Sequence, residues 1–210
     1  MREEARRVRQ EQIREAAYRL LEAHGYAGTS MLSIAKAAKA SNETLYRWYG
    51  EKKNLFKSMV EDNAEALREL LETDFAIDRP PLATLSAFGP KLLAMLLGER
   101  AVALNRAAAG DVSGELGQAI AEGGRNTIVP LLEQTMSRAI ESGDIDAVSA
   151  GEAVELYLSL LIGDLQIRRV IGVLPEPGDD EIAARSEAAM TSFLRLVALP
   201  AQRDNVARCG

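Results

Sequence analysis

The chain has 210 residues, 47% of them hydrophobic, and a formal net charge of −6 at pH 7. Its longest apolar runs, such as residues 92–97, are far shorter than the roughly 20 residues of a transmembrane helix, which argues against a membrane protein. The charged N-terminus has no signal-peptide apolar segment, and the single cysteine, Cys209, excludes an internal disulfide, so we expect a soluble cytoplasmic protein.

Helices are predicted throughout, because aromatic residues make up only 5% of the chain and no segment sustains the period-two alternation of a strand. Ile13, Ala17 and Leu21 recur at helical spacing and predict a first helix over residues 6–24. Gly25 follows this pattern and can adopt the backbone conformation that ends a helix.

Two short helices are predicted next, over residues 31–38 and 42–49, joined by a turn at Lys39–Ser41. Thr29 or Ser30 would cap the first, and Ser41 or Asn42 the second. This arrangement is typical of a helix-turn-helix, whose second helix enters the DNA major groove. We expect Ile34, Leu45 and Trp48 to be buried and Tyr46 to be exposed.

A long helix is predicted from Glu51 to about Leu71, and a linker with proline breakers covers residues 73–81. Further helices are predicted over residues 82–97, 99–109, 113–121, 124–142, 148–172 and 179–199. We therefore predict an all-α protein whose N-terminal part carries the helix-turn-helix and whose remaining part is also helical.

The charge distribution supports this division. Residues 1–60 hold 12 Lys and Arg against 7 Asp and Glu, a net +5, whereas the remaining residues carry −11. A basic segment on an acidic protein is expected where one part binds a polyanion. The acidic remainder favours a cationic or neutral small-molecule ligand over an anionic one.

Polar residues between the apolar positions are the candidates for DNA contact. We assign Lys36, Tyr46 and Lys52 to phosphates and the Thr44 hydroxyl to the backbone or a base. Asn42, Glu43 and Arg47 are the base-reading candidates, with Arg47 suited to guanine and Asn42 to adenine. Glu43 could equally be a helix cap or a solvated residue.

This region resembles the TetR family of bacterial transcriptional regulators, in register over about 32 residues. The matching residues are Gly25-Tyr26, Thr29-Ser30, Ile34-Ala35, Ser41, Thr44-Leu45-Tyr46, Trp48-Tyr49, Lys52 and Leu55-Phe56. The chain departs from the family pattern at Lys39-Ala40, where the turn usually has Gly-Val, and at Lys53, where the family often has Glu. Lys39 would then either adopt a left-handed conformation at some energetic cost or change the turn.

The resemblance implies two domains: an N-terminal three-helix DNA-binding head with the helix-turn-helix at 1–56, and a helical ligand-sensing and dimerisation body at 57–210. It also implies a homodimer whose last two long helices, here 148–172 and 179–199, form a four-helix bundle with the partner. Candidate interface residues are Leu156, Leu160, Ile167, Phe193 and Leu196, and the alternative is that these helices pack only within the subunit. Asp164 and Arg168 could form an ion pair or an interface contact. Candidate ligand-binding residues are Phe88, Met95, Asn105, Met136 and Tyr157, and for each the alternative is ordinary core packing.

The predicted function is that of a ligand-responsive transcriptional regulator, with repressor favoured over activator by the family. It would bind a pseudo-palindromic double-stranded operator and be released by a small-molecule effector. An enzyme is disfavoured, because the sequence lacks a metal-spaced cluster, a nucleophile elbow and a nucleotide-binding loop, and no cofactor is expected. The alternative is a helical dimeric ligand-binding or structural protein without DNA binding.

Overall fold

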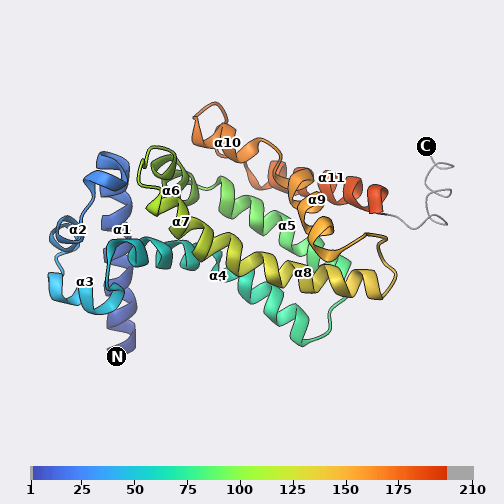
Figure 1. Cartoon of the computed structure of the whole chain (residues 1–210), viewed down its shortest axis with the longest axis horizontal. Helices are drawn as coiled ribbons and strands as arrows, with labels where there is room; N and C mark the ends of the chain where they lie inside the picture. The colour runs from blue at the N-terminus through green and yellow to red at the C-terminus, as the bar shows by residue number, and fades with distance from the viewer. Residues whose placement is uncertain (1, 198–210) are drawn as a thin grey trace. The chain divides into compact units, whose positions relative to one another are not determined.

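The computed structural model describes residues 2–197, and every regular element in that range is a helix (Figure 1). The all-α prediction is therefore confirmed. Cys209 and the predicted end of the last helix at residue 199 lie outside the described residues. No single helix in the described range is long and apolar enough to cross a membrane, although the helices Pro81–Leu97 and Glu99–Ala109 pass that test as a bent pair.

The elements follow one another in this order: α1 (Arg2–Gly28), α2 (Met31–Ala37), α3 (Asn42–Tyr49), α4 (Lys52–Ala76), α5 (Pro81–Leu97), α6 (Glu99–Ala109), α7 (Glu115–Ile120), the π-helix η1 (Ala121–Arg125), α8 (Asn126–Glu141), α9 (Ala150–Ile162), α10 (Leu165–Val170) and α11 (Asp179–Val197).

These helices form two compact units. The first unit comprises the chain up to Asn63 together with Glu99–Arg125, and the second comprises Ala64–Gly98 and the residues from Asn126 onward. The predicted domain boundary between residues 56 and 57 falls inside α4, whereas the first unit extends to Asn63. The prediction also assigned α6, α7 and η1 to the second domain, but they belong to the first unit. Burial gives the reason, because Ala103, Leu104 and Leu116 belong to the same apolar core as the helix-turn-helix.

The core of the first unit holds α1, α2 and α3 against one another. Ile13, Leu21, Ile34 and Leu45 are fully or almost fully buried there, as expected from the apolar spacing. Gly25 has φ 66°, which interrupts α1 before its last turn. The positive φ expected of this glycine is present, but its ψ of −177° is not that of the left-handed helical conformation, and the helix resumes and ends at Gly28.

The two helices of the helix-turn-helix begin at side-chain caps. The Ser30 hydroxyl accepts a hydrogen bond from the Ser33 amide, and the Ser41 hydroxyl accepts one from the Thr44 amide. Each cap satisfies an amide that has no partner within its own helix. Helices of seven and eight residues are marginal alone, so the caps and the buried residues together stabilise them.

The predicted helix over residues 148–172 is wrong, because it breaks into α9 and α10. Gly163 ends α9 with φ 51°, a backbone conformation that residues with a side chain rarely adopt. The Arg185 guanidinium then donates to the carbonyl oxygens of Leu161 at 3.0 Å and Leu160 at 2.5 Å. A cation from α11 thus satisfies carbonyls that the broken helix leaves without partners.

Candidate nucleic-acid interface

Helix α3 presents one polar face to solvent. Leu45 is fully buried beneath the helix, while Asn42, Glu43 and Arg47 are exposed. Tyr46 is 51% exposed, which confirms its expected place outside the core. The three base-reading candidates therefore lie on a helix whose opposite side is anchored, as direct readout of base edges requires.

Other residues of α3 have neighbours within the first unit. The Thr44 hydroxyl lies 2.8 Å from the Ser41 hydroxyl, so it takes part in the cap at the start of the helix. Trp48 was expected to be buried and is only half-buried; its ring packs edge-on against Tyr49, and the Arg6 guanidinium lies 5.6 Å from the ring centre. The contact with Arg6 joins the last turn of α3 to α1.

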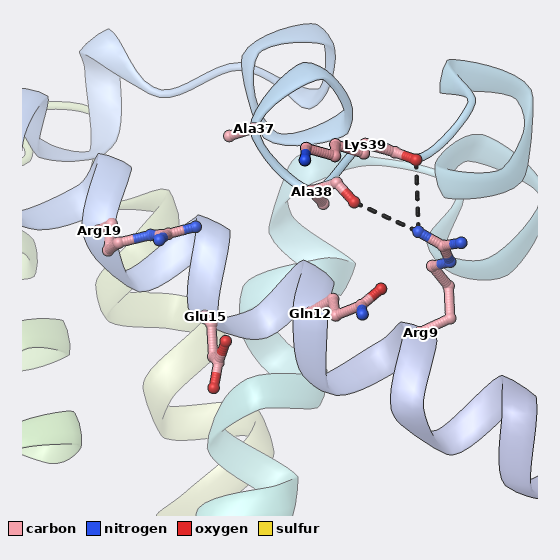
Figure 2. Close-up of a pocket in the computed structure, with 7 residues that line it drawn as sticks. All are labelled: Arg9, Gln12, Glu15, Arg19, Ala37, Ala38 and Lys39. Atoms are coloured by element: carbon pink, nitrogen blue, oxygen red, sulfur yellow. Dashed lines mark hydrogen bonds between the residues drawn. The ribbon is translucent and has the colours of Figure 1, made fainter.

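The turn between α2 and α3 contains Lys39 in the left-handed region, with φ 52°. The lysine thus adopts the conformation that glycine usually supplies. Arg9 of α1 donates to the carbonyl oxygens of Ala38 at 3.4 Å and Lys39 at 3.3 Å (Figure 2). An open groove of about 370 Å³ lies beside this contact, and Figure 2 shows its lining residues Arg9, Gln12, Glu15, Arg19, Ala37, Ala38 and Lys39.

The lysines assigned to phosphates differ in their surroundings. Lys36 is exposed near the end of α2. Lys52 is half-buried, donates to the Tyr26 carbonyl oxygen at 2.9 Å and lies 3.8 Å from the centre of the Tyr26 ring. Sequence reasoning missed this internal partner, because residues 26 apart leave no periodic signal of contact.

Lys53 also has an internal partner. Its ammonium group lies 2.7 Å from a carboxylate oxygen of Glu122 in η1 and 3.4 Å from the side-chain oxygen of Gln118 in α7. The sequence had indicated only that Lys53 adds positive charge on the DNA side. Its acidic neighbour lies 69 residues further along the chain.

The ligand-binding candidates do not form one set. Phe88, Met136 and Tyr157 are buried in the core of the second unit, and Met95 is packed against that core. Asn105 belongs to the first unit, where its amide donates to the Ala101 carbonyl oxygen at 2.8 Å.

Tyr157 has a defined polar contact within the second unit. Its hydroxyl donates to the carbonyl oxygen of Leu85 at 2.8 Å, and its ring packs edge-on against Phe193. Burial raises the pKa of this hydroxyl above its usual range, so it remains a neutral donor. Gly89 permits the contact, because a Cβ there would lie 2.8 Å from the hydroxyl oxygen.

The dimer candidates also differ in exposure. Phe193 is fully buried within the subunit, and Leu156 and Leu160 are partly buried against the same core. Ile167 is 57% exposed and Leu196 is 55% exposed, so these two are the most exposed of the dimer candidates. Asp164 and Arg168 lie 3.9 Å apart as an ion pair within α10 and its cap.

The exposed face of a capped α3, on a core shared with α1 and α2, defines a helix-turn-helix protein. Residues 13–59 match the model of bacterial regulatory proteins of the tetR family. Residues 83–196 match the model of the AefR-like transcriptional repressor C-terminal domain. The chain therefore belongs to the TetR family, whose members are DNA-binding transcriptional regulators and not enzymes.

Solved structures of the same fold include a TetR regulator from Agrobacterium tumefaciens, 28% identical, covering 90% of this chain and 94% of that one with a TM-score of 0.68. The flavonoid-responsive regulator FrrA is 26% identical over 90% of this chain and 96% of that one, with a TM-score of 0.65. FadR from Bacillus subtilis, solved with stearoyl-CoA, is 20% identical over 87% of this chain and 96% of that one, with a TM-score of 0.63. Comparison with curated proteins found no match.

Proposed function

We propose that this TetR-family regulator is a cytoplasmic repressor that binds a pseudo-palindromic operator as a homodimer and is released by a small-molecule effector. The observation that carries the proposal is the exposure of Asn42, Glu43 and Arg47 on α3, a helix anchored to its unit by the buried Leu45. Two such helices would enter successive major grooves about 34–36 Å apart.

The DNA contacts divide into base reading and phosphate binding. Arg47 is suited to a guanine and Asn42 to an adenine, whereas Lys36, Tyr46 and Lys52 would hold phosphates and Thr44 the backbone. Lys52 fits this role despite its contact with Tyr26, because an ammonium group has three donors and only one is directed at that carbonyl oxygen.

Binding to DNA upstream of the protein's own gene tests the proposal. Fluorescence anisotropy at 50 and 200 mM NaCl should show tighter binding to this DNA than to scrambled DNA, and weaker binding at the higher salt concentration. Arg47→Ala should reduce the preference over scrambled DNA by about tenfold or more. Lys91→Ala, which removes an exposed cation on α5, is the control and should leave the preference unchanged. Absence of binding at 50 mM NaCl would support a helical ligand-binding or structural dimer instead.

We propose that the homodimer forms through α9, α10 and α11, with Ile167 and Leu196 as its exposed apolar contacts and Leu156 and Leu160 beside them. Phe193 would support this surface from within the subunit. A charged pair of substitutions, Ile167→Glu with Leu196→Glu, should shift the mass measured by light scattering from dimer to monomer. A dimer that survives both changes would place the interface elsewhere.

The effector is proposed to be a neutral, largely apolar molecule bound in the second unit. Phe88, Met95, Met136 and Tyr157 would line its site, while Asn105 is less suited because it lies in the first unit. The net charge of −11 after residue 60 disfavours an anionic ligand. Release of operator DNA by naringenin, a flavonoid, but not by stearoyl-CoA would fit this view. The reverse result would overturn it.

A further inference from the structure

Two lysines on one face of α4 share a single carboxylate. The Lys53 ammonium group lies 2.7 Å from one oxygen of Glu122, and the Lys57 ammonium group lies 4.0 Å from the other. Lys57 also lies 3.9 Å from Glu61 of its own helix. Lys53 therefore depends on Glu122 for its carboxylate contact, whereas Lys57 has a second acidic neighbour.

The close approach of η1 to α4 depends on a glycine. A Cβ at Gly123 would lie 2.8 Å from the carbonyl oxygen of Lys57 and 3.2 Å from the Val60 side chain. Only a residue without a side chain allows this separation, which carries the adjacent Glu122 to Lys53. π-Helical turns such as η1 are rare and frequently occur at functional sites.

The hydrogen bond from Lys53 holds the pKa of Glu122 below its usual value, so the carboxylate is charged at neutral pH. The first turn of α4 follows α3 after only Gly50 and Glu51. A helix N-terminus with lysines beside it favours an anion. A DNA phosphate beside this helix end would then attract the Lys53 ammonium group, as the Glu122 carboxylate does.

We propose that Glu122 is an intramolecular competitor of the DNA backbone for Lys53, which makes Lys53 a further phosphate-binding residue and η1 an internal regulator of DNA affinity. This inference rests on the proposed DNA-binding function. Lys53 leaves Glu122 when a phosphate takes the place of the carboxylate. The exchange weakens binding to all DNA sequences alike, because it involves no base.

The test compares Glu122→Gln with the wild-type protein on operator DNA and scrambled DNA between 50 and 200 mM NaCl. Loss of the carboxylate should lower Kd by about two- to fivefold on both DNAs at 50 mM NaCl, the scale of one exposed ion pair. Operator preference should stay the same. Lys53→Gln alone should flatten the slope of log Kd against log salt by about 0.9, the contribution of one phosphate contact.

A general gain of positive charge would also tighten DNA binding, so the control must match the charge change. Glu61→Gln supplies it, because Glu61 pairs only distantly with Lys57 and makes no contact with Lys53. The gain from Glu122→Gln should exceed that from Glu61→Gln and should disappear in the Lys53→Gln background. An equal gain in that background would overturn the proposal.

The outcomes separate this inference from the proposed function. Wild-type protein that fails to bind any DNA at 50 mM NaCl refutes both. Wild-type binding with an unchanged affinity in Glu122→Gln refutes only the competition between Glu122 and DNA. Should Glu122→Gln lose its helical circular dichroism, the salt slope of Lys53→Gln decides the matter, since an unchanged slope would mean that Lys53 does not contact phosphate.

Discussion

The Arg9 guanidinium of α1 donates a hydrogen bond to the carbonyl oxygen of Lys39, the residue that turns the chain from α2 toward α3 with φ 52°. At 3.3 Å the contact is long, and a second one at 3.4 Å to Ala38 supplements it. Both acceptors are backbone atoms, so Arg9 stabilises the turn whatever side chain residue 39 carries. The first helix thereby supports a strained position at which the family usually has glycine.

Lys39→Gly should stabilise the first unit. A left-handed conformation costs a side-chain-bearing residue about 1–2 kcal/mol, and the greater freedom of glycine in the unfolded chain offsets about 0.5–1 kcal/mol of the gain. We expect the free energy of unfolding in urea to rise by about 0.5–1 kcal/mol. Lys39→Ala is the control, because alanine removes the charge and keeps the strain; an equal gain from both variants would refute the strain argument.

Gly89→Ala should destabilise the second unit, because its Cβ would lie 2.8 Å from the Tyr157 hydroxyl oxygen. Overpacking of this kind costs about 1–3 kcal/mol, which exceeds the gain in helix propensity of about 1 kcal/mol. In a Tyr157→Phe background the clashing oxygen is absent, so the same substitution should cost at least about 1 kcal/mol less. Urea unfolding of the two single variants and the double variant measures this coupling.

The control for that cycle is Gly117→Ala. Gly117 lies within α7, and a Cβ there would have no neighbour within 4 Å. Alanine should stabilise this position slightly by helix propensity alone. Identical costs of Gly89→Ala with and without the tyrosine hydroxyl would mean that the contact does not limit the packing.

Ser186→Ala should raise stability. The Ser186 hydroxyl is buried in the second unit and has no hydrogen-bond partner among residues 2–197. An unpaired buried hydroxyl costs about 1–3 kcal/mol, so we expect a gain of about 1 kcal/mol in thermal or urea unfolding. Ser192→Ala is the control, because its hydroxyl already donates to Ala188 and lies at the surface. A loss of stability in Ser186→Ala would indicate a bound water.

Glu11 should contribute an acid-sensitive part of the stability. Its carboxylate accepts hydrogen bonds from the guanidinium groups of Arg14 at 2.6 Å and Arg100 at 2.7 Å. The hydrogen bond from Arg14 is the largest cause that lowers the pKa of Glu11 below 4.5. A carboxylate whose pKa is lowered on folding stabilises the protein above its unfolded pKa. This contribution is lost as the pH falls through the folded value.

Glu11→Gln should therefore be less stable than the wild type at pH 7, and the difference should shrink as the pH is lowered from 4.5. Urea midpoints at several pH values between 7 and 3 measure it. Glu22→Gln, an exposed glutamate on the same helix, controls for the change of charge. A difference between wild type and Glu11→Gln that grows in acid would contradict the assignment.

The local features of this protein could be predicted because they depend on neighbours in the sequence. Ser30 and Ser41 cap helices through amides three residues away, and the spacing of Ile34 and Leu45 fixes which faces are buried. Periodicity and capping act within one or two turns, so they located the helix-turn-helix and its exposed face. The resemblance to the TetR family, which the same residues carry, added the prediction of a transcriptional regulator.

Only the tertiary structure decided the partners of residues far apart in the chain. Lys52 meets Tyr26, Lys53 meets Glu122, and Arg185 meets the carbonyls that end α9 at Gly163. A sequence pattern places a charge on a helix face but does not say which distant charge or carbonyl packs against it. The sequence by itself therefore determined the all-α class, the helix-turn-helix and the exposed face of α3. The packing of distant segments decided which of its cations are already engaged, because that depends on contacts between residues whose separation follows no period.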